Sequence, residues 1–142
     1  MSHTSFCSSW PQSHGAWGRV RYSKLKLEST LVQDITVLRC QGRISYREEA
    51  VQFSQKVADL LPHSKRLIVD FSGVELIDSA GLGELVMVLL WSQASGCSIK
   101  LAAPRRNVLE MLRLTNLVSV LEIHPTLEGA VSAFHGISIQ PS

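Results

Sequence analysis

Two residues with reactive side chains, Asp78 and Ser79, stand together between two apolar stretches in the segment VELIDSAGLGELVMVLLW. Two glycines, Gly81 and Gly83, follow within the next four residues. A serine in this setting could be a catalytic nucleophile, part of a phosphate-binding loop, the cap of a helix, or the acceptor of a covalent modification. The residue types around Ser79 favour some of these roles over others.

The surroundings of Ser79 disfavour a catalytic role. The nucleophile elbow of hydrolases has the pattern G-x-S-x-G, because its strained backbone requires glycine two residues before the serine. That position holds the β-branched Ile77. The candidate bases His63, His124 and His135 fall at the ends of expected helices or strands, where surface and capping histidines are common. We therefore predict no catalytic residues and no enzymatic activity.

A phosphate-binding loop is disfavoured as well. Such loops combine several backbone N–H groups with a lysine that neutralises the phosphate charge. The segment DSAGLGE offers Gly81 and Gly83 but no lysine or arginine, and the carboxylates of Asp78 and Glu84 would repel a nucleotide. We expect no cofactor.

A helix cap and a modification site remain, and the two roles are compatible. Asp78 and Ser79 are both favourable N-cap residues. Two glycines in the first helical turn are costly, at roughly 0.5–1 kcal/mol each relative to alanine, which indicates an open backbone surface that another molecule approaches. A phosphate on Ser79 would be tolerated by the helix dipole but would add about −1.5 to −2 charges. The fold would survive while a bound partner would be displaced, which describes a binding switch.

The composition is typical of a globular protein of one domain. The chain has 142 residues, of which 45% are hydrophobic and 18% charged, with a net charge of +2, and this argues against disorder over its whole length. The longest apolar run, residues 85–91, is far shorter than the roughly 20 residues of a bilayer-spanning helix. Three widely spaced cysteines, Cys7, Cys40 and Cys97, favour a reduced protein without disulfides or a metal site. We expect a cytosolic protein that does not insert into a membrane.

The two ends of the chain differ from the rest. Residues 1–23 lack hydrophobic periodicity and are expected to form a flexible extension, and residues 137–142 are expected to form a C-terminal tail. The early part of the chain contains four basic residues before the first acidic one: Arg19, Arg21, Lys24 and Lys26. This cluster is sparser than the basic stripes of nucleic-acid-binding proteins, so we expect no direct contact with nucleic acid.

The stretch between these ends, residues 24–136, alternates between strand and helix signals. The expected strands cover residues 24–30, 35–42, 66–73, 98–104 and 117–125. Helices are expected from Ser45 to Pro62, from Asp78-Ser79 to Gly96, over residues 105–116 and over residues 127–134. A short turn at residues 32–34 makes the first two strands an antiparallel hairpin, and intervening helices imply parallel pairing of the later strands. We predict an α/β single domain with a mixed sheet in the order β-β-α-β-α-β-α-β-α.

Two finer patterns concern the helices. Ser45, followed three residues later by Glu48, has the spacing of a capping box. In the helix after Ser79, one apolar face is expected to pack against the core: Leu82, Leu85, Val86 and Leu89. Met87 and Trp91, four residues apart, would then lie on another side, where a partner could contact them, although such residues are more often additional members of the core.

The segment VDFSGVELIDSAGLGELV resembles the signature of STAS domains, the sulfate-transporter and anti-sigma-factor-antagonist group. Its core pattern, D-S-x-G-L-G, is matched at Asp78, Ser79, Gly81, Leu82 and Gly83. A second stretch, LAAPRRNVLEMLRLTNLVSVLEIHPTLEGAV, is similar to the family's later order of strand, proline, helix and final strand. The resemblance covers about residues 24–136 and implies the STAS fold.

The resemblance implies a small bacterial cytoplasmic protein that binds an anti-sigma factor with serine-kinase activity and thereby frees a sigma factor for transcription. The kinase would switch the protein off by phosphorylating Ser79, and a metal-dependent serine phosphatase would reverse this. The neighbouring Ala80 occupies a position often filled by Ser or Thr, so Ser79 is the single candidate hydroxyl. The expected partner-binding residues are Asp78, Ser79, Ala80, Gly81, Leu82, Gly83, Met87, Arg43 and Ser45. The oligomeric state is left open.

Two residues depart from the family pattern. Members commonly read G-E-L-D after the second strand, whereas this chain reads GRIS, with Arg43 at the glutamate position and Ser45 at the aspartate position. The reversed charge at Arg43 favours an alternative function, a STAS scaffold subunit of a transporter or of a multi-protein sensory assembly, in which Ser79 stays unmodified. The intact serine favours the phosphorylated switch.

Overall fold

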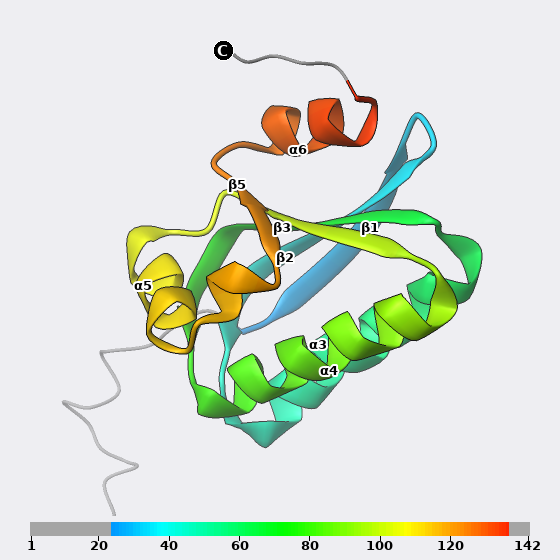
Figure 1. Ribbon diagram of the computed structural model, residues 1–142. Helices are drawn as coiled ribbons and strands as arrows, with labels where there is room; N and C mark the ends of the chain where they lie inside the picture. Colours follow the sequence, from blue (N-terminus) through cyan, green and yellow to red (C-terminus); the bar gives the residue numbers. More distant parts are fainter. Residues whose placement is uncertain (1–23, 137–142) are drawn as a thin grey trace, which may run out of the picture.

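The computed structural model describes residues 24–136, which form a mixed sheet of five strands with helices on both faces (Figure 1). The elements along the chain are β1 (Lys26–Val32), β2 (Ile35–Ile44), α3 (Tyr46–Leu60), η2 (Leu61–His63), β3 (Arg66–Ile77), α4 (Ser79–Ser95), β4 (Ser98–Ala102), α5 (Arg106–Leu114), η3 (Leu117–Ser119), β5 (Glu122–His124) and α6 (Leu127–Phe134). The predicted fold class and order of elements are confirmed. The flexible extension expected for residues 1–23 and the tail expected for residues 137–142 lie outside the described residues.

The sheet follows the order of the sequence, β1-β2-β3-β4-β5. β1 and β2 form the predicted antiparallel hairpin, and every later neighbour is parallel. Because a parallel crossover is almost always right-handed, the three connecting helices α3, α4 and α5 come to lie on the same face.

Two strands differ in length from the prediction. β3 continues past Gly73 to Ile77, because the end of β2 runs beside it and Ile44 pairs with Ile77. The last strand is reduced to β5, because the chain forms the 3-10 turn η3 after Asn116, whose φ of 62° reverses its direction. The extension of β3 carries its end, and the residues after it, beyond the end of β4.

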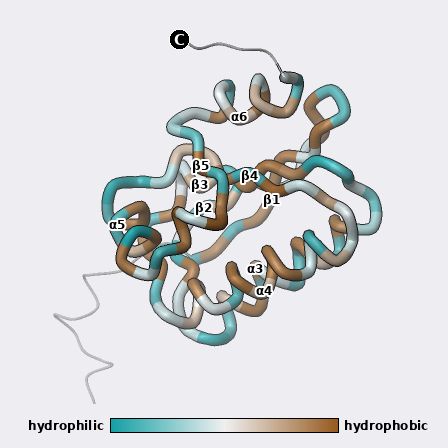
Figure 2. The backbone as a smooth tube through the Cα atoms, in the orientation of Figure 1, coloured by the Kyte–Doolittle hydropathy of each residue, from teal (hydrophilic) through white to brown (hydrophobic). Residues whose placement is uncertain are grey.

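The main core lies between the sheet and helices α3, α4 and α5, and the hydrophobic colour in Figure 2 gathers on these facing surfaces. Phe53 of α3 and Phe71 of β3 meet edge to face, with 6.0 Å between ring centroids, an arrangement that aromatic pairs prefer. Val108 and Leu112 of α5 complete the same cluster. This core fixes the positions of the helices that border the site.

The opposite face of the sheet carries a smaller cluster covered by α6. Thr126 caps this helix as predicted, with its Oγ1 accepting a hydrogen bond from Gly129 N at 2.9 Å. Lys100, only 8% exposed, pairs with Glu122 at 2.8 Å and lies 4.5 Å from the ring centroid of Phe134. A buried cation requires such partners, so the cluster fastens α6 to β4 and β5.

The buried face of α4 differs from the prediction. Leu82 and Leu85 are buried as expected, and Leu89 packs against the core, but Val86 is 38% exposed and Val88 is fully buried instead. Of the two roles considered for Trp91, the structure supports the core role, because Trp91 packs against the main core. The helix contacts both the sheet and α3, which turns its buried arc toward Leu85 and Val88.

Three further observations on the described residues concern membrane spans, metal sites and cysteines. No helix among them is long and apolar enough to cross a membrane, and no group of three or more His, Cys, Asp or Glu residues among them could hold a metal ion. Cys40 and Cys97 are buried free thiols. Burial raises the pKa of both thiols, which keeps them in the unreactive protonated form.

Candidate functional site

Ser79 is the first residue of α4 and follows directly on the end of β3. In Figure 1 this junction lies at the lower left, where α4 begins. The side chain of Ser79 is exposed. The cap of α4 is its neighbour Asp78, whose Oδ1 accepts a hydrogen bond from Gly81 N at 3.0 Å. Of the two N-cap candidates, the structure therefore uses Asp78.

Asp78 also binds a second helix. Its Oδ2 accepts a hydrogen bond from Tyr46 N, the first residue of α3, at 2.9 Å. The two helix N-termini meet here because the ends of β2 and β3 are neighbours in the sheet. Partial burial acts to raise the pKa of Asp78, but the backbone N–H groups of Tyr46, Gly81 and Ala80 outweigh it and lower the pKa below its ordinary value. The carboxylate is thus charged and fully engaged at neutral pH.

The two glycines of the segment serve different purposes. A Cβ on Gly81 would collide with the backbone oxygen of Ile44 and approach Ile77 Cγ1 to 2.7 Å, so this glycine lets α4 pack closely against the end of β2. A Cβ on Gly83 would meet nothing within 4 Å, and the residue is exposed. Packing therefore explains Gly81 but not Gly83.

Arg43 and Ser45, which depart from the family pattern, contact Glu49 of α3. Arg43 Nε lies 3.0 Å from both carboxylate oxygens of Glu49, and Ser45 Oγ donates to Glu49 Oε1 at 3.3 Å. Ser45 does occupy the N-cap position, but its side chain makes no capping bond, so the predicted capping box with Glu48 is not formed. Asp78 caps α3 from the neighbouring strand instead.

Tyr46 belongs to this cluster and was not predicted from the sequence. Its ring lies beneath the guanidinium of Arg43, with 5.1 Å from Cζ to the ring centroid. No motif marks this tyrosine. Its spacing from Ala50 and Phe53 places Tyr46 on the expected core face of the helix, so the pattern would have indicated burial rather than exposure.

The remaining expected partner-binding residues divide by exposure. Gly83 and Met87 are exposed on α4, and Ala80 is half-buried. Leu82 belongs to the main core and Ser45 is buried, so neither side chain can serve as the surface contact that the sequence suggested; both support the site from beneath. Met87 lies with Val86 and Leu90 in an exposed apolar stripe that leads away from Ser79 along α4.

The three candidate histidines lie on different elements. His63 lies in η2, His124 pairs with Glu122 on β5, and His135 caps α6 near Asp34. None of these contacts involves Ser79.

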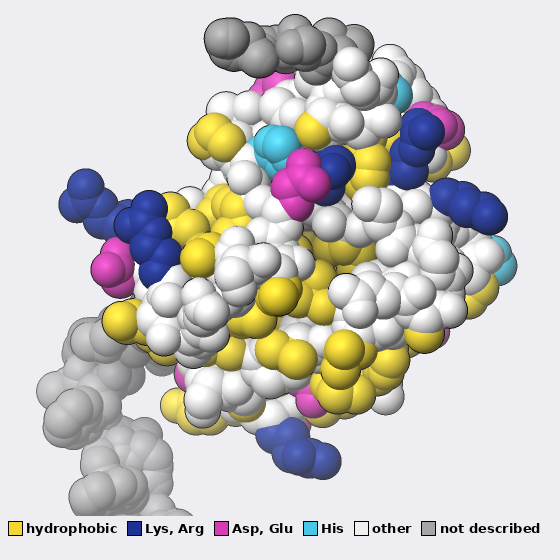
Figure 3. All heavy atoms as spheres, in the orientation of Figure 1, with side chains coloured by type: hydrophobic (Ala, Val, Ile, Leu, Met, Phe, Trp, Pro, Cys, Tyr) yellow, Lys and Arg dark blue, Asp and Glu magenta, His cyan; other side chains and the backbone are white. Residues whose placement is uncertain are grey.

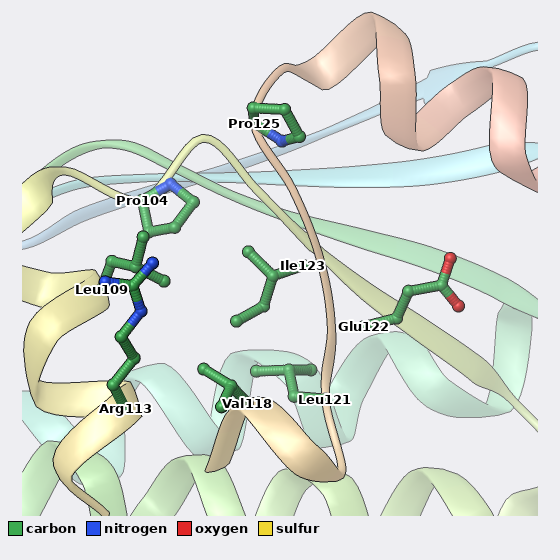
Figure 4. A pocket seen from close by; sticks show the side chains of 8 residues that line it. All are labelled: Pro104, Leu109, Arg113, Val118, Leu121, Glu122, Ile123 and Pro125. Carbon is green, nitrogen blue, oxygen red and sulfur yellow. The ribbon is translucent and has the colours of Figure 1, made fainter. Parts of the chain in front are cut away.

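A separate hollow lies between α5, η3 and β5 (Figure 4). It has a volume of about 550 Å³ and is lined by Pro104, Leu109, Arg113, Val118, Leu121, Glu122, Ile123 and Pro125. It includes no residue of the Asp78 to Gly83 segment. In the space-filling view of Figure 3, hydrophobic side chains gather over this region and over α4 below it.

Comparisons with known proteins agree with this fold. The family model described as "Mlab, STAS domain" matches residues 30–122. A protein from Thermotoga maritima whose name describes it as an anti-sigma factor antagonist is 31% identical over 103 residues. These residues make up 71% of this chain and 90% of the relative.

Two solved structures share the fold. An anti-sigma factor antagonist from Mycobacterium paratuberculosis superposes with a TM-score of 0.72 at 20% identity, covering 79% of this chain and 95% of that one. The anti-sigma factor antagonist SpoIIAA in its unphosphorylated form gives a TM-score of 0.66 at 20% identity, covering 81% and 99%. The chain therefore belongs to the STAS domain family, among the anti-sigma factor antagonists.

Proposed function

We propose that the protein is an anti-sigma factor antagonist of the bacterial cytoplasm, switched by phosphorylation at Ser79. In its unmodified form it binds an anti-sigma factor that is a serine kinase, and so frees a sigma factor for RNA polymerase. The observation that carries the proposal is that two different residues at the start of α4 provide the helix cap and the exposed hydroxyl. Asp78 caps the helix, and among residues 24–136 no hydrogen bond from Ser79 Oγ supports the fold, so this exposed hydroxyl is available for modification.

The switch requires two reactions supplied by partners. In the first, Ser79 Oγ attacks the γ-phosphorus of ATP held by the kinase, the bond to the β–γ bridging oxygen breaks, ADP leaves, and the hydroxyl proton passes to a base of the kinase. In the second, a serine phosphatase directs water at the phosphorus, so that inorganic phosphate leaves and Ser79 regains its proton. SpoIIAA, a protein of the same fold, has been solved in unphosphorylated and phosphorylated forms, which supports this chemistry here.

The surroundings of Ser79 explain how a phosphate would release the partner. It adds about −1.5 to −2 charges beside the charged carboxylate of Asp78, on the rim of an apolar stripe formed by Val86, Met87 and Leu90. A partner that covers the stripe and the open backbone at Gly83 would have to bury that charge, which is costly without a cation to pair with it. The helix dipole lowers the cost within the protein itself.

The proposal is tested by incubating the protein with ATP and each candidate anti-sigma kinase of the same genome, followed by intact-mass spectrometry. We expect one phosphate with one kinase, and none in the Ser79→Ala control. A stable complex without phosphate transfer from any kinase would instead support the scaffold role, in which Arg43 departs from the family pattern for a different partner. Ester hydrolysis that is lost in Ser79→Ala would revive an enzymatic role.

Ser79→Asp is expected to leave the melting temperature unchanged and to weaken kinase binding at least about tenfold, since like or unpaired charge at an interface costs more than the 1.4 kcal/mol that a factor of ten represents. Isothermal titration with the kinase and ADP measures this, with Ser79→Ala as the uncharged control. Near-wild-type affinity of the aspartate variant would argue against an electrostatic switch.

A further inference from the structure

Tyr46, the first residue of α3, is 64% exposed although its side chain is aromatic. Its φ of 60° lies in the left-handed region, which a bulky L-residue rarely adopts. Neither feature favours folding by itself, and such strained positions persist only where surrounding contacts hold them, which often occurs at functional sites.

Three side chains hold Tyr46 in place. Asp78 Oδ2 accepts its backbone N–H at 2.9 Å, and the guanidinium of Arg43 covers one side of its ring, 5.1 Å from the centroid. Arg43 is in turn fixed by both carboxylate oxygens of Glu49 at 3.0 Å. The ring is therefore positioned before any partner arrives, which reduces the conformational entropy lost on binding.

The cluster offers an apolar surface whose charges cancel. Glu49 balances Arg43, and these two side chains are 15% and 30% exposed, whereas the ring of Tyr46 projects beyond them. An unpaired arginine here would attract an acidic group, but Arg43 already has its carboxylate. Tyr and Arg are enriched among the residues that dominate binding energy at interfaces, and a neutral, exposed ring is best covered by an apolar side chain.

Asp78 links the start of α3 to the segment that contains the serine. Its carboxylate accepts hydrogen bonds from Tyr46 N and Gly81 N, and Ser79 lies in the chain between Asp78 and Gly81. We propose that Tyr46 is a contact residue for the partner that covers Ser79, that it selects a partner with an apolar side chain opposite its ring, and that Arg43, Glu49 and Asp78 are its positioning residues. The inference rests on the proposed function, because the partner is the same kinase.

The test is isothermal titration of the full chain with the kinase and ADP, so that Ser79 stays unmodified. We expect Tyr46→Ala to raise Kd at least about tenfold and Tyr46→Phe, which keeps the ring, to stay within about twofold. Leu114→Ala is the matched control, since Leu114 is 76% exposed at the end of α5, away from the site; its Kd should equal that of the wild type. In phosphorylation kinetics, Tyr46→Ala should raise KM and leave kcat unchanged.

Tyr46→Gly separates binding from folding. Glycine adopts φ near 60° without strain, so this variant should melt at the wild-type temperature or above it and still bind at least about tenfold more weakly. A merely structural tyrosine would lose stability and affinity together, and that result would overturn the inference. Wild-type affinity in Tyr46→Ala would overturn the contact alone, while failure of the wild type to bind any kinase would overturn the proposed function and the contact with it.

Discussion

Asp78 determines more of the geometry around Ser79 than the serine does. One carboxylate oxygen binds the first turn of α4 and the other binds the first residue of α3, so a single side chain sets the relation between two helix N-termini. The aspartate of the D-S-x-G-L-G pattern therefore has a structural reason to be present. It fixes the backbone around the exposed hydroxyl of Ser79.

Asp78→Asn is expected to lower the free energy of unfolding at pH 7, and to lower it less as the pH falls below the unfolded-state pKa of about 3.9. Partial burial acts to raise the pKa of Asp78, but backbone N–H groups outweigh it and lower the pKa in the folded state. A folded-state pKa below the unfolded value of about 3.9 gives a stabilisation that is complete above that value and is lost as the pH falls through the folded-state pKa. Urea denaturation of both proteins between about pH 3 and 7 measures this; a difference independent of pH would contradict it.

Alanine at Gly81 and at Gly83 should have opposite effects. Gly81→Ala places a Cβ against Ile44 O and Ile77 Cγ1, and we expect it to reduce the free energy of unfolding by about 1–3 kcal/mol. Gly83→Ala meets open space and should raise it by roughly 0.5–1 kcal/mol, the usual gain in a helix. Thermal or urea denaturation decides both. Equal destabilisation would mean that Gly83 has a packing role that the structure does not show.

The sequence and contacts of α4 suit the partner surface proposed for this helix. Between Leu82 and Trp91 its only charged residue is Glu84, and a helix that is apolar on nearly all sides is normally buried on all sides. One side of α4 does pack into the core, but Val86, Met87 and Leu90 remain exposed among the described residues. An uncovered apolar stripe next to a modifiable serine is the arrangement expected of a regulated interface.

Val86 and Val88 provide a matched pair on this helix. Val88 is fully buried, and Val88→Ala should lower the free energy of unfolding by about 2 kcal/mol, through lost burial and the cavity left behind. Val86→Ala should change stability by less than about 0.5 kcal/mol but weaken kinase binding. Stability curves and titrations of both variants check this pair, and an unaltered affinity in Val86→Ala would remove the exposed stripe from the interface.

At the scale of the whole molecule, the site occupies the carboxyl ends of adjacent parallel strands. β2 and β3 both end there, and open α/β sheets place their binding sites at this edge because the loops and helix N-termini converge on it. The opposite face of the sheet, under α6, holds a separate cluster. Changes at α6 are therefore expected to act mainly on stability, whereas changes at exposed residues near the β2 and β3 ends are expected to act on the proposed recognition.

Deletion of residues 1–22 is expected to leave the melting temperature within a few degrees of the wild type, since these residues lack hydrophobic periodicity and, within the part of the chain that the structure describes, residues between Leu25 and Phe134 form both hydrophobic clusters. Differential scanning calorimetry of the full and shortened chains measures this. A fall well beyond a few degrees would show that the removed residues contribute to the core.

Much of the fold could be predicted because its signals are local. Alternation, apolar runs, the Thr126 cap and the short turn before Ile35 each act within a few residues, and all are found in the structure. The end of β3 and the rotation of α4 could not be predicted in this way. They depend on pairing with Ile44 and on packing against α3, which bring together residues distant in the chain.

The candidate site, likewise, could be predicted from the sequence only in part. The D-S-x-G-L-G pattern located Asp78 and Ser79, because the motif is contiguous. The contacts of Arg43 with Glu49 and of Tyr46 with Asp78 join β2, α3 and the end of β3, and no sequence pattern announces them. Ser45 shows the converse. Its spacing from Glu48 indicated a capping box, but its hydroxyl donates to Glu49 instead, and Asp78 accepts the first N–H group of α3.

The strand order β1-β2-β3-β4-β5 has a consequence for how the protein folds during synthesis on the ribosome. Each strand after the first pairs with the strand synthesised just before it, so no contact in the sheet has to wait for a distant part of the chain. Mixed α/β domains have intermediate contact order and intermediate folding rates, and chains are completed from the N-terminus onward. As synthesis proceeds, each strand from β2 to β4 offers the edge that the next strand covers, while the outer edge of β1 stays unpaired within the described residues.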